Sequence, residues 1–375
     1  MKKISKKQML ILSLLPGGLT LTRLFSMSPD LIEKHYSQGL YHLLARALGY
    51  ISQCLPLSLA EVLVSMAVLG LLGGLIKQGL NISKGTLALK AALKKDALFL
   101  VAVFSLGYFL FLLLWGFNYY RLPLAELMGL DTTHIRAEEL ESLCMQLIQE
   151  SNELRMALPE DSEGVVMGDK REVLRKAGEG FAQLAGTYQE LGGNYTKPKA
   201  LIMSELLSHL ALSGIYFPFT AEANVNMGIP TPLFPATVAH EMAHQKGFAR
   251  EDEANYIAYL SCRQHPDPYH QYSGSLLALI NAMNALARLD YEQYQDLQLG
   301  YAAGVRRDLA AISQYWQQYK GPMARTSARV NDAYLQFNGQ EEGINTYGRM
   351  VDLLIGERRL SVPQILEDGG KDSRK

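Results

Sequence analysis

Residues 235–255 read PATVAHEMAHQKGFAREDEAN and contain a His-Glu-x-x-His motif. Pro235 suits the first turn of a helix, and Gly247 suits the left-handed residue that ends one. The stretch therefore predicts a helix of about twelve residues between them. On such a helix His240 and His244 lie one turn apart on the same face. Two imidazoles at that spacing can bind one Zn²⁺ and leave positions for a further ligand and a water.

Glu241 follows the first histidine of the motif and lies beside the metal-binding face. Its carboxylate can take a proton from a zinc-bound water and later deliver that proton to a leaving amine. The motif thus predicts a zinc-dependent hydrolase in which His240 and His244 are metal ligands and Glu241 is the general base.

A third ligand is expected from a second helix that begins near Glu251. If Gly247 lets the chain turn back, the two helices pack together, and Glu251 and Asn255 share the face toward the first helix. Glu251 can then reach the metal, and Asn255 can accept a hydrogen bond from a ligand histidine and fix its tautomer. Glu253 is the alternative ligand. Acidic residues here also stabilise a helix N-terminus without any metal.

The 375-residue chain divides into two parts of opposite charge. Residues 1–117 contain twelve Lys/Arg and four Asp/Glu, a net charge of +8, whereas the rest contains 24 and 33, a net charge of −9. The total of −1 argues against a nucleic-acid partner, which usually needs a basic surface. The apolar content of 48% excludes disorder as the main state. The two parts are therefore expected in different surroundings.

Three apolar segments in the basic part predict transmembrane helices in contact with a lipid bilayer. We expect them at about 9–27, 55–76 and 97–117. The third segment contains no charged residue. Trp115, Tyr119 and Tyr120 at its end are expected to form an aromatic belt at the bilayer surface. A cleaved signal peptide is the alternative for the first segment, but no small-x-small cleavage site follows it.

Lysines are concentrated in two regions of this predicted membrane anchor, the N-terminal segment and one loop. Four of the first seven residues are lysines, and the loop between the second and third segments contains Lys77, Lys84, Lys90, Lys94 and Lys95. By the positive-inside rule both regions are cytoplasmic. The sequence therefore predicts a membrane anchor at 1–117, an extracytoplasmic domain at 118–366 and a polar tail at 367–375.

The predicted extracytoplasmic domain is mainly helical. Amphipathic patterns predict helices over 137–157, 169–191, 199–213, 235–246, 251–264, 273–297, 300–319 and 347–358. The aromatic and β-branched stretch Ile215–Val225 predicts a short edge strand, because Pro218 is tolerated only at a sheet edge. Asn224 and Asn226 in this region either bind substrate or hold turns.

The HExxH motif followed by Glu251-x-x-Ala-Asn255 on a second helix resembles the gluzincin metallopeptidases. More narrowly, Phe217–Leu260 is similar to a family of bacterial membrane proteins known only as a domain of unknown function, with three N-terminal spans and a zincin-like domain. The resemblance implies a zincin-like (gluzincin) fold in the bacterial cytoplasmic membrane. In one respect the chain differs, because Asn255 stands where many gluzincins have Asp.

The same resemblance implies further site residues. The edge strand is expected to pair with an extended peptide, and Tyr347 and Arg349 are candidate donors to the oxyanion of a tetrahedral intermediate. These two residues alternatively form a helix start with a surface charge. The leading hypothesis is a membrane-anchored zinc metallopeptidase that acts on a peptide or protein substrate. The alternative is a zinc-binding membrane sensor or scaffold without catalytic activity.

Overall fold

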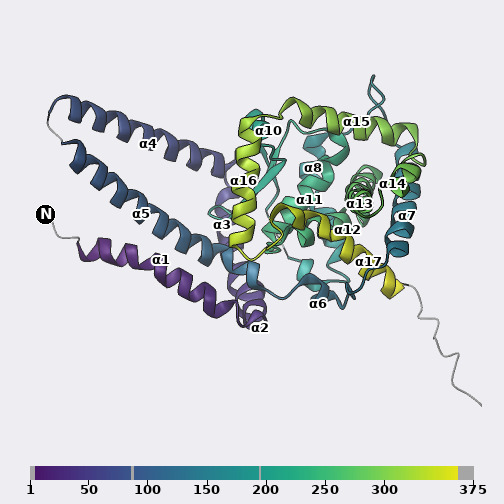
Figure 1. The fold of residues 1–375 in the computed structure, drawn as a ribbon, viewed down its shortest axis with the longest axis horizontal. Helices are drawn as coiled ribbons and strands as arrows, with labels where there is room; N and C mark the ends of the chain where they lie inside the picture. Colours follow the sequence, from purple (N-terminus) through teal and green to yellow (C-terminus); the bar gives the residue numbers. More distant parts are fainter. Residues whose placement is uncertain (1–4, 86–87, 194–195, 362–375) are drawn as a thin grey trace, which may run out of the picture.

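The computed structural model describes residues 5–85, 88–193 and 196–361. Three long N-terminal helices project from a mainly helical globular part that contains a three-stranded sheet (Figure 1). The predicted mainly α architecture, with three apolar N-terminal helices and a small sheet, is confirmed. The polar tail predicted at 367–375 lies outside the described residues.

The elements of the described chain follow in sequence order. The N-terminal part contains α1 (Lys6–Phe25), α2 (Pro29–Leu31), a π-helical segment (Ile32–Leu40), α3 (Tyr41–Gln53), α4 (Leu59–Ser83), α5 (Leu89–Leu114), a 3₁₀ turn (Gly116–Tyr120) and α6 (Leu124–Met128). The middle contains α7 (Ala137–Met156), α8 (Lys170–Lys176), α9 (Gly178–Leu184), a 3₁₀ turn (Gln189–Leu191), β1 (Lys199–Leu201), α10 (Ser204–His209), β2 (Gly214–Phe217), β3 (Glu222–Asn226) and a 3₁₀ turn (Thr231–Leu233). The remainder contains α11 (Phe234–Gln245), α12 (Glu251–Arg263), α13 (Pro268–Leu289), α14 (Tyr291–Gln298), α15 (Ala303–Gln318), α16 (Pro322–Phe337), a 3₁₀ turn (Gly343–Arg349) and α17 (Met350–Ser361).

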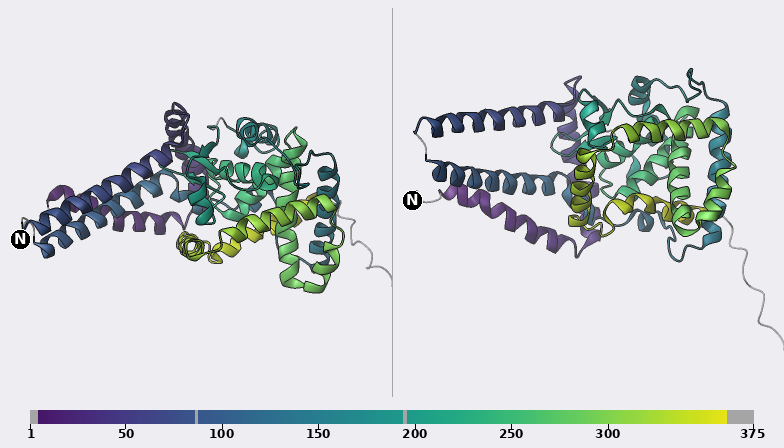
Figure 2. Two further views of the ribbon diagram at one scale, coloured as in Figure 1. Left: turned by 90° about the horizontal axis from the view of Figure 1, so that it is seen from above. Right: turned by 45° about the horizontal axis from the view of Figure 1, so that its top comes forward.

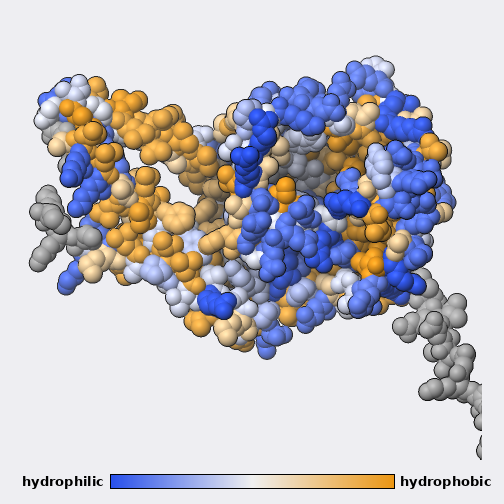
Figure 3. All heavy atoms as spheres, viewed as in Figure 1, coloured by the Kyte–Doolittle hydropathy of each residue, from blue (hydrophilic) through white to orange (hydrophobic). Residues whose placement is uncertain are grey.

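Helices α1, α4 and α5 are each long and apolar enough to cross a bilayer. The candidate spans are Lys6–Phe25, Leu59–Ser83 and Ala92–Leu114, close to the predicted ranges. At most 11% of each apolar window is buried inside the protein, and Figure 3 shows the apolar side chains on the surface of these helices. Such a surface fits contact with lipid.

The spans have one end at the globular part and one end away from it. The start of α1, the end of α4 and the start of α5 lie together at the distant end (Figures 1 and 2). The connection between α1 and α4, which includes α3, lies at the globular end (Figure 1). The lysines of the two lysine-rich regions that the structure describes at the ends of the helices are therefore on the opposite side of the candidate spans from the globular part; they are Lys6, Lys7, Lys84, Lys90, Lys94 and Lys95.

The aromatic residues after the third span pack against protein, which corrects the predicted belt. Trp115 and Tyr119 are buried. The indole N–H of Trp115 donates to the His244 carbonyl oxygen at 3.2 Å, and the Tyr119 hydroxyl donates to that of Tyr334 at 3.0 Å. Tyr120 is only partly buried. These aromatic rings fix the globular part onto the third span, a role that depends on partners far away in the sequence.

Buried polar contacts also join the spans to the end of helix α11. Arg121 forms a buried ion pair with Glu33 and donates to the Gly247 carbonyl oxygen at 3.0 Å. The Tyr41 hydroxyl donates to the Gln245 carbonyl oxygen at 2.8 Å. These carbonyl groups lie at the C-terminus of a helix, where intrahelical partners are lacking. Residues between the first two candidate spans and just after the third therefore hold the end of helix α11 in place.

The sheet corrects the single predicted strand Ile215–Val225. Strand order is β1-β3-β2, with β1 parallel and β2 antiparallel to β3. The predicted strand is thus a hairpin whose turn contains Pro218, with β2 at the edge and β3 buried in the centre. The helix predicted over 199–213 is also wrong at its start, because Lys199–Leu201 pairs with β3 as β1.

Two predicted long helices are interrupted. The pattern over 169–191 forms α8, α9 and a 3₁₀ turn, in a stretch where glycines lower helix propensity. Gly180 there packs against the backbone of Ser261 too closely for a side chain. The pattern over 273–297 is divided at Asp290, which has φ −144° and caps α14 through its side chain. At Asp290 a cap thus ends a helix that periodicity alone would continue, whereas Gly180 lies inside α9 and allows its close approach to α12.

Candidate metal centre

Helices α11 and α12 pack side by side, and Gly247 makes the turn between them possible. Its φ of +89° lies in the left-handed region, which favours glycine. A Cβ at this position would also lie 2.9 Å from the Tyr41 ring. Helix α11 begins with Pro235 in its first turn, so the start and stop signals of the sequence act as predicted.

The two helices bring His240, His244 and Glu251 to one point. The two Nε2 atoms of the histidines are 3.0 Å apart, and Glu251 Oε2 lies 3.2 Å from His240 Nε2 and 3.3 Å from His244 Nε2. Zinc bonds of about 2.0–2.1 Å at tetrahedral angles place neighbouring ligand atoms about 3.3 Å apart. The triangle therefore has nearly the size of one face of a tetrahedral zinc site.

Hydrogen bonds fix the tautomer of both histidines. His240 Nδ1 lies 2.8 Å from Asn255 Oδ1, and His244 Nδ1 lies 2.8 Å from the Phe248 carbonyl oxygen. Asn255 donates through Nδ2 to the Tyr347 carbonyl oxygen at 3.2 Å, which orients its amide. Because carbonyl oxygens only accept, each imidazole donates through Nδ1 and presents the lone pair of Nε2 to the cluster. The expected hydrogen bond, in which Asn255 accepts from a histidine, is therefore present between His240 and Asn255.

When both imidazoles are neutral, three lone-pair atoms thus converge without a donor hydrogen among them. Glu251 Oε2 is buried with no hydrogen-bond partner. Burial by itself would raise the pKa of Glu251, but the adjacent His244 and His240 hold it well below its ordinary value. Burial would lower the pKa of His244, but Glu251 outweighs that effect and raises it to about 9. The cluster therefore attracts one positive charge, which a proton or a metal ion can supply.

The donor set fits Zn²⁺. Two imidazole nitrogens and one carboxylate oxygen are a known set for catalytic zinc, and they leave a position open for water or substrate. The alternative ligand Glu253 lies outside the cluster. Its Oε1 accepts from the backbone N–H of Leu124 at 2.7 Å and from Arg250 Nη1 at 2.9 Å. The face of α12 that meets α11 thus carries Glu251 rather than Glu253.

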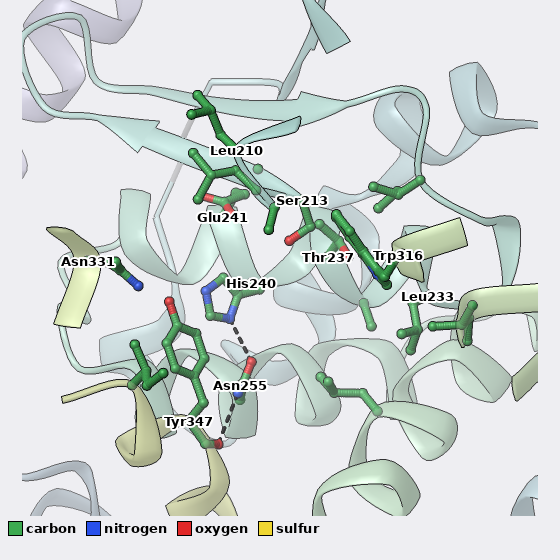
Figure 4. Close-up of a pocket in the computed structure, with 18 of the residues that line it drawn as sticks. Leu210, Ser213, Leu233, Thr237, His240, Glu241, Asn255, Trp316, Asn331 and Tyr347 are labelled. Atoms are coloured by element: carbon green, nitrogen blue, oxygen red, sulfur yellow. Dashed lines mark hydrogen bonds between the residues drawn. The ribbon is translucent and has the colours of Figure 1, made fainter. Parts of the chain in front are cut away.

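Glu241 lies between helix α11 and strand β2 (Figure 4). It is 4% exposed, and its Oε2 has no hydrogen-bond partner. Burial raises the pKa of Glu241, while His240 and His244 oppose the rise. Gly214 on β2 makes this position possible, because a Cβ there would lie 2.6 Å from Glu241 Oε1. A buried carboxylate with a raised pKa and a free oxygen has the properties of a general base.

A cleft of about 450 Å³ opens beside His240 and Glu241. Figure 4 shows His240, Glu241, Asn255 and Tyr347 around it. Its walls come from the residues that lead into β2, from α15 and α16, and from the 3₁₀ turn before α17; they include Leu210, Ser213, Gly214, Trp316, Asn331 and Ile344. Substrate-sized space therefore adjoins both the ligand cluster and the candidate base.

The family described as "Protein of unknown function (DUF3810)" matches residues 36–355. The chain belongs to this family. No curated protein and no solved structure matches it. The match includes two of the three candidate spans and every candidate site residue. Because the description of the DUF3810 family names no activity, function must be argued from the site.

The two candidate oxyanion donors of this DUF3810 protein lie in different places. The ring of Tyr347 lies nearly parallel to that of His240, at 14° and 6.3 Å between centroids. Burial raises the pKa of Tyr347 well above its ordinary value, so its hydroxyl stays protonated and able to donate. Arg349 instead is exposed and paired with Glu342 and Asp352. Its position fits the alternative of a surface charge.

Asn224 and Asn226 lie on the central strand β3 and are fully buried. Asn224 binds the Ser58 hydroxyl through Oδ1 and the Ile215 carbonyl oxygen through Nδ2. Asn226 donates to the Ser208 hydroxyl oxygen and accepts from the Gly228 backbone N–H. Their amides are thus used within the fold and are not open to a substrate: Asn226 holds a turn through Gly228, whereas Asn224 joins the residue before α4 to strand β2.

The cleft also contains residues that the sequence did not indicate. Asn331 on α16 and Trp316 on α15 line the cleft and lie on opposite sides of it in the view of Figure 4. Asn331 interacts with the side chain of Tyr347. Neither residue belongs to a motif, and both are more than 60 residues from the HExxH sequence. Only the path of the chain back over the cleft brings them to the site.

Proposed function

We propose that this protein is a membrane-anchored, zinc-dependent metallopeptidase with a gluzincin-like site. One observation carries the proposal. The lone-pair atoms of His240, His244 and Glu251 form a triangle of 3.0–3.3 Å beside a cleft that contains the buried, partly unpaired carboxylate of Glu241. A site that only stored zinc would not need that carboxylate, because burying it without a partner costs stability.

Each residue of the proposed site would have a separate role in the reaction. When bound, Zn²⁺ supplies Lewis acidity toward a substrate carbonyl and toward water. Glu241 takes a proton from the attacking water and delivers it to the leaving amine, and its raised pKa favours that exchange. The protonated hydroxyl of Tyr347 donates to the oxygen that becomes negative. Asn255 and the Phe248 carbonyl group keep both imidazoles oriented.

The shape of the cleft supports a peptide substrate. Residues 210–214, which lead into the edge strand β2, form one wall of the cleft. An edge strand has unpaired backbone groups that can bind an extended peptide as an added strand. Such a peptide would cross the cleft beside Glu241, since Gly214 contacts that carboxylate.

We place the globular part outside the cytoplasm. The lysine-rich end of the spans lies away from the globular part (Figure 1). That end contains Lys6, Lys7, Lys84, Lys90, Lys94 and Lys95. Under the positive-inside rule it faces the cytoplasm, so the cleft faces the other side of a bacterial cytoplasmic membrane.

The test uses the full-length protein in detergent. We expect wild-type protein to contain about one zinc and to hydrolyse members of a broad peptide library. Glu241→Gln should keep the zinc and lose activity by at least about 10²-fold, whereas His240→Ala should lose the zinc. Glu138→Gln, at an exposed glutamate of α7, is the control and should match wild type.

Two outcomes would contradict this function. Wild-type protein that binds no metal would refute the zinc site altogether. Bound zinc with no hydrolysis of any peptide, and equal cellular phenotypes for Glu241→Gln and wild type, would favour the zinc-binding sensor or scaffold.

A further inference from the structure

Helix α16 (Pro322–Phe337) exposes an apolar stripe. Met323, Val330 and Phe337 are 48%, 64% and 61% exposed. Their spacing of seven residues places them along one side of the helix. Exposed apolar residues that line up in this way usually mark a surface that another apolar phase or molecule covers.

The position of α16 indicates which phase covers the stripe. Figures 1 and 2 show α16 at the boundary between the globular part and the spans. The ring of Phe337 lies 6.1 Å from that of Tyr108, and the ring of Tyr334 lies 6.2 Å from that of Phe111. Tyr108 and Phe111 belong to the third candidate span, Ala92–Leu114.

The depth of this contact can be worked out from helix geometry. Tyr108 lies six residues before the end of the span at Leu114, which at 1.5 Å per residue is about 9 Å along the helix. Interfacial helices bury their apolar face about 5–10 Å into the boundary between headgroups and acyl chains. Phe337, at one end of the stripe, is therefore at the level of the lipid interface.

Charge and chain connectivity support the same placement. Arg329 and Arg325 are exposed on α16 at about 100° and 140° around the helix from Val330, so the helix has a basic side away from its apolar stripe, as interfacial helices do. Helix α3 lies in the connection between the first two spans, so it must lie next to the bilayer surface. It also exposes large apolar residues, namely Leu43, Tyr50 and Ile51. The apolar surface of the spans thus continues onto both helices.

We propose that α16 is an interfacial membrane helix, with Met323, Val330 and Phe337 inserted into the same bilayer that the three spans cross. A neighbouring face of α16 carries Ser327, Ala328 and Asn331, which line the cleft. One wall of the cleft is therefore a helix embedded in the membrane surface, so the cleft lies beside the bilayer. If the site is a peptidase, as proposed above, its substrates are peptide segments tethered to that membrane.

Spin-label accessibility of the full-length protein in phosphatidylcholine–phosphatidylglycerol vesicles tests the insertion. The background is Cys54→Ser, because Cys54 is exposed whereas Cys144 and Cys262 are buried. A nitroxide at Val330→Cys should be reached by oxygen more than by a water-soluble nickel reagent. Leu299→Cys, at a leucine 75% exposed on the far side of the globular part, is the matched control and should show the reverse. Equal nickel accessibility at both positions would overturn the proposal.

The substrate class has a separate test in the same vesicles. A lipid-tethered peptide should be cleaved at least about tenfold faster than the same peptide free in solution, because tethering raises its local concentration. Val330→Glu should reduce cleavage of the tethered peptide and leave cleavage of the free peptide unchanged. Equal rates on both peptides would overturn the tethered-substrate class. No cleavage of either would refute the proposed peptidase function, while the spin labels would still decide the insertion.

Discussion

Replacing Asn255 with alanine tests the metal centre through a single hydrogen bond. Asn255 Oδ1 lies 2.8 Å from His240 Nδ1 and keeps the proton of that imidazole away from Nε2. Asn255→Ala removes the acceptor and leaves the ring free to turn and to change tautomer. Loss of such an outer hydrogen bond typically weakens metal binding about 10–100-fold. The expected loss of zinc-binding free energy is therefore about 1.4–2.8 kcal/mol.

A second substitution separates the two hydrogen bonds of this side chain. Asn255 also donates from Nδ2 to the Tyr347 carbonyl oxygen at 3.2 Å, so alanine disturbs Tyr347 as well. Asn255→Asp keeps an acceptor for His240 but loses the donor to Tyr347. Because a carboxylate partner raises the basicity of a ligand histidine, we expect Asn255→Asp to bind zinc at least as tightly as wild type.

The assay is competition for zinc between the full-length protein in detergent and a chromogenic chelator. Asn281→Ala is the matched control, since Asn281 lines the same cleft and its side chain donates only to the Leu277 carbonyl oxygen at 2.9 Å. The control should bind zinc as wild type does. If Asn255→Ala binds zinc as tightly as Asn281→Ala, the reasoning about the tautomer is refuted.

Three further substitutions have expected outcomes. Gly214→Ala would place a Cβ 2.6 Å from Glu241 Oε1 and displace the carboxylate, so peptide turnover should fall about 10²-fold with zinc content unchanged; full activity would contradict the placement of Glu241. Arg349→Ala removes only exposed ion pairs, so zinc content should stay the same and stability should change by less than about 1 kcal/mol in thermal unfolding; loss of zinc would contradict this. Burial lowers the pKa of His270 to about 3, and His265 adds to that effect. Because the unfolded chain takes up this proton below about pH 6.5 and the folded protein does not, stability is full above that pH and falls as pH falls toward 3. About 1–2 kcal/mol should be lost between pH 6.5 and 5, and His270→Phe, compared with wild type by thermal unfolding at both pH values, should lose about that much less.

The sequence by itself determined the features that depend on near neighbours. The spacing of His240 and His244 places their side chains together on any α-helix, and Pro235 and Gly247 set the ends of that helix through backbone preferences. The three candidate spans follow from composition over about 20 residues each. Such features need no knowledge of the rest of the fold, because the interactions that produce them lie within a few residues.

The tertiary structure alone decided the features that depend on distant partners. The packing of α12 against α11 selects Glu251 over Glu253, although both are acids at one helix start. Likewise Tyr347 reaches the cleft while Arg349, two residues later, points to solvent. Trp115 is buried against α11 instead of facing lipid. The burial of Trp115 depends on contact with a helix more than 100 residues away in the sequence. The difference between Glu251 and Glu253, and between Tyr347 and Arg349, depends on less than one turn of backbone. Local periodicity contains no information about either.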